Sequence, residues 1–349
     1  MNKVYKHLLG GLSLFFSLLN CAGCQSSFPS DYSLGILYST EYNDRSKISY
    51  LDENLNGLTD IFYPYGYMGH DGYTNANIID EVLYECPLGK ATEKNLGLII
   101  GLNMNSGEIA EYNINRTNIT DFICCNAFIY ATSNLNGRNY IDQYNKADGS
   151  ICSLELEQYY VSELAFNDNV LYGFGVKLDN QDQGNIIHLF KFDFKSKQVE
   201  TLYNLSGYLD DSPSYSIIRQ NMLYFAENGY LFAYDLKDNT LNQMALMHKN
   251  AFNLLCDGDI LYIGCTDIFT EAKSWIDVID LKTNKQIASY PINHSILQME
   301  ISGNYIYVSD YNTITKYYMI DNQLKESGKI TLEPEENYYV GGFFVREEK

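Results

Sequence analysis

The chain has 349 residues, of which 46% are apolar, and a formal net charge of −20. It is too long for one small domain, too apolar for a disordered tail and too acidic for a general nucleic-acid binder, because such binders need clustered Lys and Arg. The 32 tyrosines indicate β-structure, since flat and half-polar rings suit a pleated, half-buried surface.

The N-terminal segment has the pattern of a secretion signal. A short basic start, with Lys3 and Lys6, precedes an uncharged apolar run from Leu8 to Leu19. About twenty apolar residues are needed to cross a bilayer, so this shorter run predicts a signal-peptide core. We predict a cleaved signal over residues 1–23, a short tether over residues 24–33 and a single domain over residues 34–349.

Ala22 and Gly23, directly before Cys24, resemble the bacterial lipobox. The residue three places before the cleavage is Cys21, where that signal usually has Leu. The resemblance implies that Cys24 becomes the lipidated first residue of the mature chain, anchored to a membrane of the bacterial cell envelope on its extracytoplasmic side. Leu18-Leu19-Asn20-Cys21 is a second lipobox candidate, in which Asn20 is a poor residue before cleavage. The other alternative is an ordinary secretory signal with incidental cysteines.

Six cysteines remain beyond Cys24, and they show no CxxC or Cys/His spacing typical of zinc sites. They could pair as disulfides outside the cytoplasm. Their neighbours have the composition of strand cores, which favours buried free thiols. The six are Cys86, Cys124, Cys125, Cys152, Cys256 and Cys265.

An apolar residue, then Leu or Ile, then Tyr recurs seven times along the chain. The tyrosines of this motif, here called the column tyrosines, are spaced 38 to 52 residues apart, a near-constant period that is typical of radial or stacked repeats. The column tyrosines are Tyr38, Tyr84, Tyr130, Tyr172, Tyr224, Tyr262 and Tyr307.

A second recurring position follows each column tyrosine, where an apolar strand ends in Asp or Asn before a turn. These residues are Asp52, Asn103, Asn145, Asp193, Asp235, Asp280 and Asp321. Gly beside Asp or Asn, as in Asp257-Gly258-Asp259, is the signal of a hairpin between strands. The pattern therefore predicts four antiparallel strands in each unit of about 45 residues, which is the size of one propeller blade. The predicted fold is an all-β, seven-bladed β-propeller.

The sixth and seventh units resemble the YVTN-type β-propeller repeat. Residues 276–285 fit its pattern, and Tyr307-Val308-Ser309-Asp310 stands where that family has Tyr-Val-Thr-Asn. The other units match more loosely. The resemblance implies a seven-bladed propeller but no activity, because propellers host binders, scaffolds and enzymes alike.

The C-terminal run from Tyr338 to Val345 is β-patterned and lies beyond the seventh unit. The segment between Cys24 and Ile36 is too short for a tether and a full innermost strand. We predict that the C-terminal run supplies that strand of the first blade and closes the ring, since an exposed edge strand would favour aggregation.

Loop lengths predict one working face. With the strands of a blade lettered A to D from the axis outward, the A–B and C–D turns lie on one face of the disc and the B–C and D–A connections on the other. The first set is short. The second set is longer and defines the long-loop face, which we expect to carry any binding site. Its predicted loops include residues 39–46, 64–76, 131–139, 177–185, 206–214 and 264–274.

The Gly-rich connection after the first unit carries side chains that could stack on a sugar or clamp a peptide, or could instead plug the channel mouth. They are Tyr63, Tyr65, Tyr67, His70, Asp71 and Tyr73. Trp275 is a further aromatic expected on the long-loop face, with blade packing as the alternative. Arg45, Lys47 and Arg138 are positive charges expected in these loops, where they would meet an acidic ligand or be solvated.

Asp52, Asn54, Asn56 and Asp60 resemble the first part of a calcium loop, which needs six or more oxygen ligands. The closing acid is replaced by Tyr63, and the segment aligns with the C–D turns of the other units, so a plain turn is favoured. Motifs of nucleophilic hydrolases, zinc proteases and phosphate-cradling loops are absent from the sequence. We expect no cofactor.

The sequence therefore predicts a monomeric, membrane-anchored propeller that binds a surface protein or a glycan without catalysis. The alternative is an extracytoplasmic enzyme of the lyase or lactonase type, with acidic and His residues at the channel mouth. A third possibility is a sensor or accessory lipoprotein of a transport system.

Overall fold

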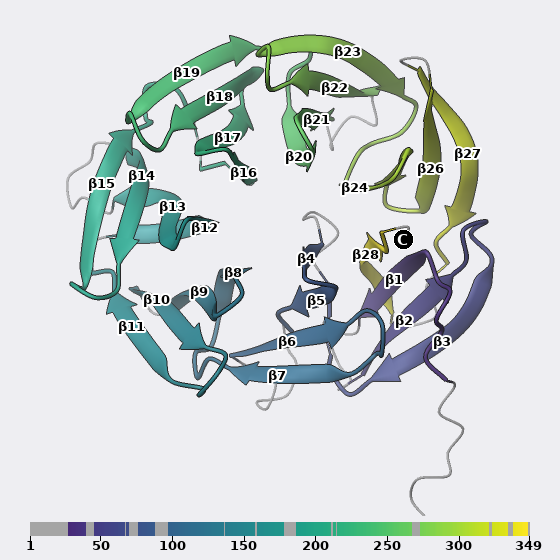
Figure 1. The fold of residues 1–349 in the computed structure, drawn as a ribbon, viewed down its shortest axis with the longest axis horizontal. Helices are drawn as coiled ribbons and strands as arrows, with labels where there is room; N and C mark the ends of the chain where they lie inside the picture. The colour runs from purple at the N-terminus through teal and green to yellow at the C-terminus, as the bar shows by residue number, and fades with distance from the viewer. Residues whose placement is uncertain are drawn as a thin grey trace, which may run out of the picture.

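The computed structural model describes residues 27–39, 45–66, 68–69, 76–87, 97–135, 137–157, 159–177, 186–210, 212–213, 215–266, 273–320, 323–333 and 338–347. Its strands form seven four-stranded antiparallel sheets, arranged radially around a central axis (Figure 1). The predicted seven-bladed β-propeller is thus confirmed. Cys24 and the predicted signal lie outside the described residues.

The first three blades follow in chain order, each given from the axis outward. Blade one contains β28 (Tyr339–Val345), β1 (Leu34–Ser39), β2 (Ser46–Leu51) and β3 (Gly57–Tyr63). Blade two contains β4 (Asn77–Ile79), β5 (Val82–Glu85), β6 (Leu98–Asn103) and β7 (Ile109–Asn113). Blade three contains β8 (Ile119–Cys124), β9 (Phe128–Leu135), β10 (Arg138–Asn145) and β11 (Ile151–Glu155).

The remaining four blades repeat the same order. Blade four contains β12 (Tyr159–Asn167), β13 (Val170–Lys177), β14 (Ile186–Asp193) and β15 (Gln198–Asn204). Blade five contains β16 (Ser216–Arg219), β17 (Met222–Glu227), β18 (Tyr230–Asp235) and β19 (Thr240–Ala245). Blade six contains β20 (Ala251–Asp257), β21 (Ile260–Cys265), β22 (Ser274–Asp280) and β23 (Lys285–Ile292). Blade seven contains β24 (Gln298–Ser302), β25 (Tyr305–Ser309), β26 (Thr313–Ile320) and β27 (Gln323–Thr331).

The ring is closed by the C-terminal strand, as predicted. β28 pairs antiparallel with β1, from Leu34 opposite Val345 to Ser39 opposite Tyr339. Figure 1 shows the last strand lying inside the first blade, so the two ends of the domain meet in one sheet. Pairing hides the backbone edge that β1 would otherwise expose.

The hydrophobic core lies between neighbouring blades, in seven clusters that each join the facing sides of two sheets. In blades two to seven, the column tyrosine is buried and packs toward the next blade. The repeated motif therefore marks one inter-blade contact, which explains why the same residue type recurs at that place.

Blade one departs from the predicted alignment. Leu34 pairs with Leu51, directly before Asp52, so Gly35 rather than Tyr38 holds the place of the column tyrosine. Tyr38 instead packs against blade seven. The motif at Tyr38 is therefore shifted by three residues, a difference that only strand pairing shows.

Blade seven departs at the second recurring position. Ile260 pairs with Asp280 in blade six, whereas Tyr305 pairs with Tyr318 in blade seven. Tyr318 thus takes the expected place of Asp321, because β26 continues beyond that place to Ile320. Asp321 itself lies outside the described residues.

The other Asp and Asn residues at this position shape the C–D turns. Asp280 Oδ1, for example, accepts the backbone N–H of Lys282 at 2.8 Å and that of Thr283 at 3.4 Å. These hydrogen bonds to the carboxylate lower the pKa of Asp280. A short side chain that accepts backbone donors two and three residues ahead stabilises a turn. The preference for Asp or Asn at this position therefore has its cause within the turn itself.

One predicted long loop, residues 131–139, is wrong. β9 runs to Leu135 and β10 begins at Arg138, with Gly137 at a φ of 74°. The sequence contains a hairpin signal here, Asn136-Gly137. The polar residues around it resemble a long loop, which is why the prediction was wrong. The predicted loop residues 40–44, 178–185 and 267–272 lie outside the described residues.

Within the described residues, no helix is long and apolar enough to cross a membrane. All six cysteines beyond Cys24 are free thiols in the structure, and three of them are buried. This agrees with the prediction that the six cysteines are free thiols.

Candidate functional site

Tyr63 and Tyr65, predicted to face a ligand, are buried between the first and second blades, with 6% and 5% of their surface exposed. The hydroxyl of Tyr63 lies 2.9 Å from that of Tyr50, and the hydroxyl of Tyr65 donates to Glu111 Oε1. Burial raises the pKa of both phenols. The two rings therefore pack the blades together. The other predicted members of this connection, Tyr67, His70, Asp71 and Tyr73, lie outside the described residues.

The remaining predicted ligand contacts lie on three different blades. The Arg45 guanidinium lies 5.8 Å from the ring centroid of Phe62 on blade one. Arg138 is the exposed first residue of β10, and Trp275 is the second residue of β22. The structure does not bring these side chains together.

The calcium candidate forms the turn between β2 and β3. Asp52 Oδ1 accepts the backbone N–H groups of Asn54 and Asn56 at 2.9 and 2.8 Å. Asp60 lies in β3, with its carboxylate 3.3 Å from Lys47 Nζ. In the part of the chain that the structure describes, no group of three or more His, Cys, Asp or Glu side chains is placed to hold a metal ion.

A ring of polar side chains on the innermost strands was missed by the sequence analysis. Four members lie opposite the residue two places after the column tyrosine of their own blade, and the fifth, Tyr215, directly precedes β16. The residue type varies from blade to blade, so no repeated letter marks the position. This inner polar ring consists of Asp121, Glu163, Tyr215, Asn253 and Gln298.

Two carboxyl groups of the inner polar ring bind the next blade. Asp121 Oδ2 accepts the backbone N–H of Leu164 at 2.6 Å, and Glu163 Oε1 accepts the N–H and hydroxyl of Ser216 at 3.0 and 2.9 Å. Burial raises the pKa of Asp121 to about 7. Burial, and then the charge of Asp121, also raise the pKa of Glu163. These acids therefore join blades three, four and five near the axis.

The ring continues across the closure. Gln298 donates to the backbone carbonyl of Phe343 at 2.6 Å and accepts its N–H at 3.0 Å, which ties β24 to β28. Glu300 Oε1 accepts from Gln298 at 2.9 Å and from the backbone N–H of Ala76 at 2.7 Å. Side chains of blade seven thus hold both the closing strand and the start of blade two.

A cavity of about 180 Å³ lies between blades five and six, beside the inner polar ring. Its lining comes from the inner strands and from the connections of the long-loop face. The lining residues are Tyr215, Ala226, Glu227, Asn250, Ala251, Asn253, Leu254 and Thr266. None of the described lining residues is Lys, Arg or His.

Asn253 carries a buried acceptor on the face of blade six that packs against blade seven. Its side chain is 0% exposed, and Nδ2 donates to the backbone carbonyl of Leu297 at 3.4 Å. That bond orients the amide, because the opposite orientation would place Oδ1 against the carbonyl oxygen. Oδ1 has no hydrogen-bond partner among the described residues. An unpaired buried oxygen costs about 1–3 kcal/mol.

Exposed aromatic and apolar side chains also lie on the long-loop face, and two of them contact Phe232 of the cluster between blades four and five. Tyr208 and Tyr230 both contact Phe232, with ring centroids 6.0 and 6.2 Å away. Met247 is 71% exposed, and Leu246 beside it donates its N–H to Gly229 at 2.9 Å. We call Tyr208, Tyr230 and Met247 the apolar rim.

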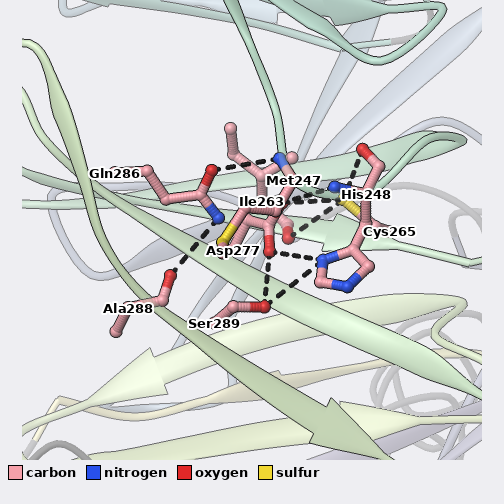
Figure 2. A network of polar contacts seen from close by, with 8 residues as sticks. All are labelled: Met247, His248, Ile263, Cys265, Asp277, Gln286, Ala288 and Ser289. Carbon is pink, nitrogen blue, oxygen red and sulfur yellow. Dashed lines mark hydrogen bonds and ion pairs between the residues drawn. The ribbon is translucent and has the colours of Figure 1, made fainter.

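A second polar cluster lies on blade six, where His248 meets a fully buried carboxylate (Figure 2). His248 Nδ1 lies 2.8 Å from Asp277 Oδ1, and the Ser289 hydroxyl donates to the same oxygen at 2.7 Å. The imidazole stacks on Trp275 with a centroid distance of 4.2 Å and an interplanar angle of 11°. Asp277 is 0% exposed, so its hydrogen bonds fix the orientation of His248.

Comparison with solved structures finds likeness along most of the chain at low identity. A provisionally assigned 6-phosphogluconolactonase from Bacteroides uniformis ATCC 8492 has a TM-score of 0.60 at 12% identity, covering 90% of this chain and 100% of that one. AztD from Citrobacter koseri has a TM-score of 0.54 at 9% identity, covering 89% and 97%. No family model matches the sequence, and no curated protein matches it. At these identities the likeness shows the fold alone, a seven-bladed β-propeller.

Proposed function

We propose that the protein is a ligand-binding propeller on the extracytoplasmic side of a membrane, anchored there through lipidated Cys24. The observation that carries the binding function is the cavity of about 180 Å³ between blades five and six, whose lining joins apolar residues such as Ala226 and Leu254 to polar ones such as Tyr215 and Glu227. Binding sites join apolar surface to a few convergent polar groups in this way. The partner is a surface protein or a glycan.

Filling the cavity tests this function. Ala251 lines the cavity at the start of β20, and Ala110 lies exposed on the outer strand β7. We expect Ala251→Leu to block binding and Ala110→Leu to leave it intact. The measurement is the thermal shift of the purified mature protein with fractionated envelope extracts. Equal shifts in the wild type and both variants would remove the cavity from the proposal.

The anchor has its own test. We expect Cys24→Ala to abolish incorporation of labelled palmitate and to move the protein out of the membrane fraction. Cys21→Ala is the matched control and should leave both readouts unchanged. Lipid incorporation into Cys24→Ala would contradict the assignment of the modified cysteine.

A second candidate function, an extracytoplasmic enzyme, is supported by the His248–Asp277 pair. A carboxylate at Nδ1 prepares the other ring nitrogen for proton transfer. Ser289 lies 3.3 Å from the same Nδ1, however, so the three residues do not form a triad with the hydroxyl facing Nε2. Turnover of a lactone or an acidic polysaccharide that His248→Gln removes would establish this candidate.

A further inference from the structure

We propose that the segment before β1 places one face of blades one and two next to the bilayer and keeps the long-loop face clear of it. The face that meets the membrane is formed by the A–B and C–D turns and is here called the short-turn face. This inference rests on the proposed lipid anchor at Cys24 and adds the surface that the anchor turns toward the membrane. It is carried by the contacts of residues 28–33 and by the length of chain between them and Cys24.

The segment before β1 packs on the C–D turns of the first two blades. The Phe28 ring lies directly over Gly107, so that a Cβ at this glycine would overlap it, and it meets Tyr50 edge-to-face with ring centroids 5.3 Å apart. Tyr32 is 3% exposed, and its hydroxyl donates to the backbone carbonyl of Met104 at 2.8 Å. Gly107 and Met104 belong to the turn between β6 and β7, so the segment lies on the short-turn face.

The residue after the closing strand fixes the same segment. The backbone N–H of Arg346 donates to the carbonyl of Ser33 at 2.9 Å, and Ser33 donates its own N–H to Leu51 at 2.8 Å. The guanidinium of Arg346 donates to the carbonyl of Ser30 and to the side chain of Asn105 in blade two. Both blades therefore hold the segment, and the folded domain sets its path across the short-turn face.

The chain between this segment and the anchor is short. Cys24 lies four positions before Phe28, which limits the distance between their Cα atoms to about 14 Å even in a fully extended chain. The strands β1 and β2, of six residues each, separate the two faces of blade one by about 20 Å. A lipid on Cys24 therefore reaches the bilayer from the short-turn face, and the long-loop face cannot lie on the same bilayer.

This placement decides what the long-loop face can bind. The cavity between blades five and six opens among connections of that face, and the apolar rim lies on it as well. Because the short tether keeps this face clear of the bilayer, its occupant arrives from the aqueous side. The apolar rim therefore contacts a partner molecule rather than membrane lipid.

Quenching of tryptophan by a spin-labelled lipid headgroup tests the placement, because it acts only over short distances. The lipidated mature protein is bound to vesicles of phosphatidylethanolamine and phosphatidylglycerol that carry the label. Trp275, at the long-loop end of β22, is the natural reporter. In a Trp275→Phe background, Glu108→Trp places a reporter on the exposed turn of blade two. Phe62→Trp is its matched control in the adjoining blade one, at the long-loop end of β3.

We expect the quenching of Glu108→Trp to exceed that of Phe62→Trp and that of Trp275 at least about twofold, because the two faces are about 20 Å apart. Equal quenching of Glu108→Trp and Phe62→Trp, or stronger quenching of Phe62→Trp, would overturn the placement. Melting temperatures of the variants report whether they are folded.

The length of the tether has its own test. A Gly/Ser linker of about 12 residues, inserted between Ser26 and Ser27, adds a mean reach of about 19 Å. We expect this insertion to remove the difference in quenching between Glu108→Trp and Phe62→Trp. The same linker added after Lys349 is the matched control and should preserve the difference. A difference that survives the insertion at Ser26 would show that the tether does not set the orientation.

Flotation with the vesicles separates this inference from the proposed function. If the wild type and Cys24→Ala float equally, or if neither floats, the lipid anchor is wrong and the placement fails with it. If only the wild type floats and the two reporters are quenched equally, the anchor stands while the placement is wrong.

Discussion

The ring of Phe344 occupies the space over Gly35 in which the other blades carry their column tyrosine. The two residues are paired across β28 and β1, and Phe344 is fully buried between blades one and two. A Cβ at position 35 would overlap the Phe344 ring. The closing strand therefore contributes an aromatic ring as well as backbone hydrogen bonds, and blade one needs glycine at position 35 to receive it.

This packing predicts the effect of removing the ring. We expect Phe344→Ala to lower the free energy of unfolding by about 3–5 kcal/mol, the usual loss for a large buried aromatic side chain. Phe62→Ala, in the same blade but half exposed, should cost less than about 1 kcal/mol. Urea unfolding of the mature protein measures both. Similar losses in the two variants would refute the role of the ring in closure.

The inner polar ring predicts a pH dependence of stability. Burial raises the pKa of Asp121 from 3.8 to about 7, so between these values the folded protein keeps a proton that the unfolded chain has lost. This contribution to stability is present at low pH and is lost as the pH rises toward 7, with a slope of up to about 1.4 kcal/mol per pH unit.

Asp121→Asn should reduce that slope, because the amide does not titrate, while the buried Glu163, whose pKa is also raised, keeps its own contribution. The exposed Asp257→Asn is the control and should leave the slope unchanged. The measurement is the free energy of unfolding in urea between about pH 4.5 and pH 8. A slope in Asp121→Asn equal to that of the wild type would contradict the assignment to Asp121.

The stacking of His248 on Trp275 predicts an optical signal. Trp275 is the only tryptophan of the protein, so its fluorescence reports on this one contact. We expect His248→Ala to change the emission intensity of the folded protein, because it removes the ring stacked on the indole. His294→Ala, which removes a different contact with Tyr317, should leave the emission unchanged.

The cysteines predict an order of chemical labelling. Cys86, Cys124 and Cys265 are buried, and burial raises the pKa of all three thiols, which keeps them in the unreactive protonated form. We expect iodoacetamide to label Cys125 and Cys152 first in the native protein, as mapped by mass spectrometry. All six should react alike in urea. Native labelling of Cys265 as fast as that of Cys152 would contradict the described packing.

Much of the fold could be predicted because its signals are local. A column tyrosine and a turn-forming Asp or Asn recur once per blade, and each has a reason within its own neighbourhood, such as the N–H groups that Asp280 accepts. The two errors of alignment fall in blades one and seven. In blade one, the ring at the tyrosine position comes from Phe344, near the C-terminus. The residues around Gly35 carry no pattern that predicts this.

The candidate site could not be predicted in the same way. Tyr63 and Tyr65 looked like ligand contacts because they follow one another in a Gly-rich segment, but neighbouring blades cover them. Asn253 has the sequence context of an ordinary strand residue, and its burial and its hydrogen bond depend on Leu297 in the next blade. Such positions depend on pairs of residues that are distant in sequence.

By itself, the sequence determined the number of blades, the strand order within each blade and closure by the C-terminal strand, because hydrophobic alternation and turn chemistry act over a few residues. The tertiary structure alone decided which polar groups meet at the axis and where a cavity remains. Burial and electrostatic energy depend on contacts between blades, so Glu163, Tyr215 and Asn253 acquire their properties only when the ring is closed.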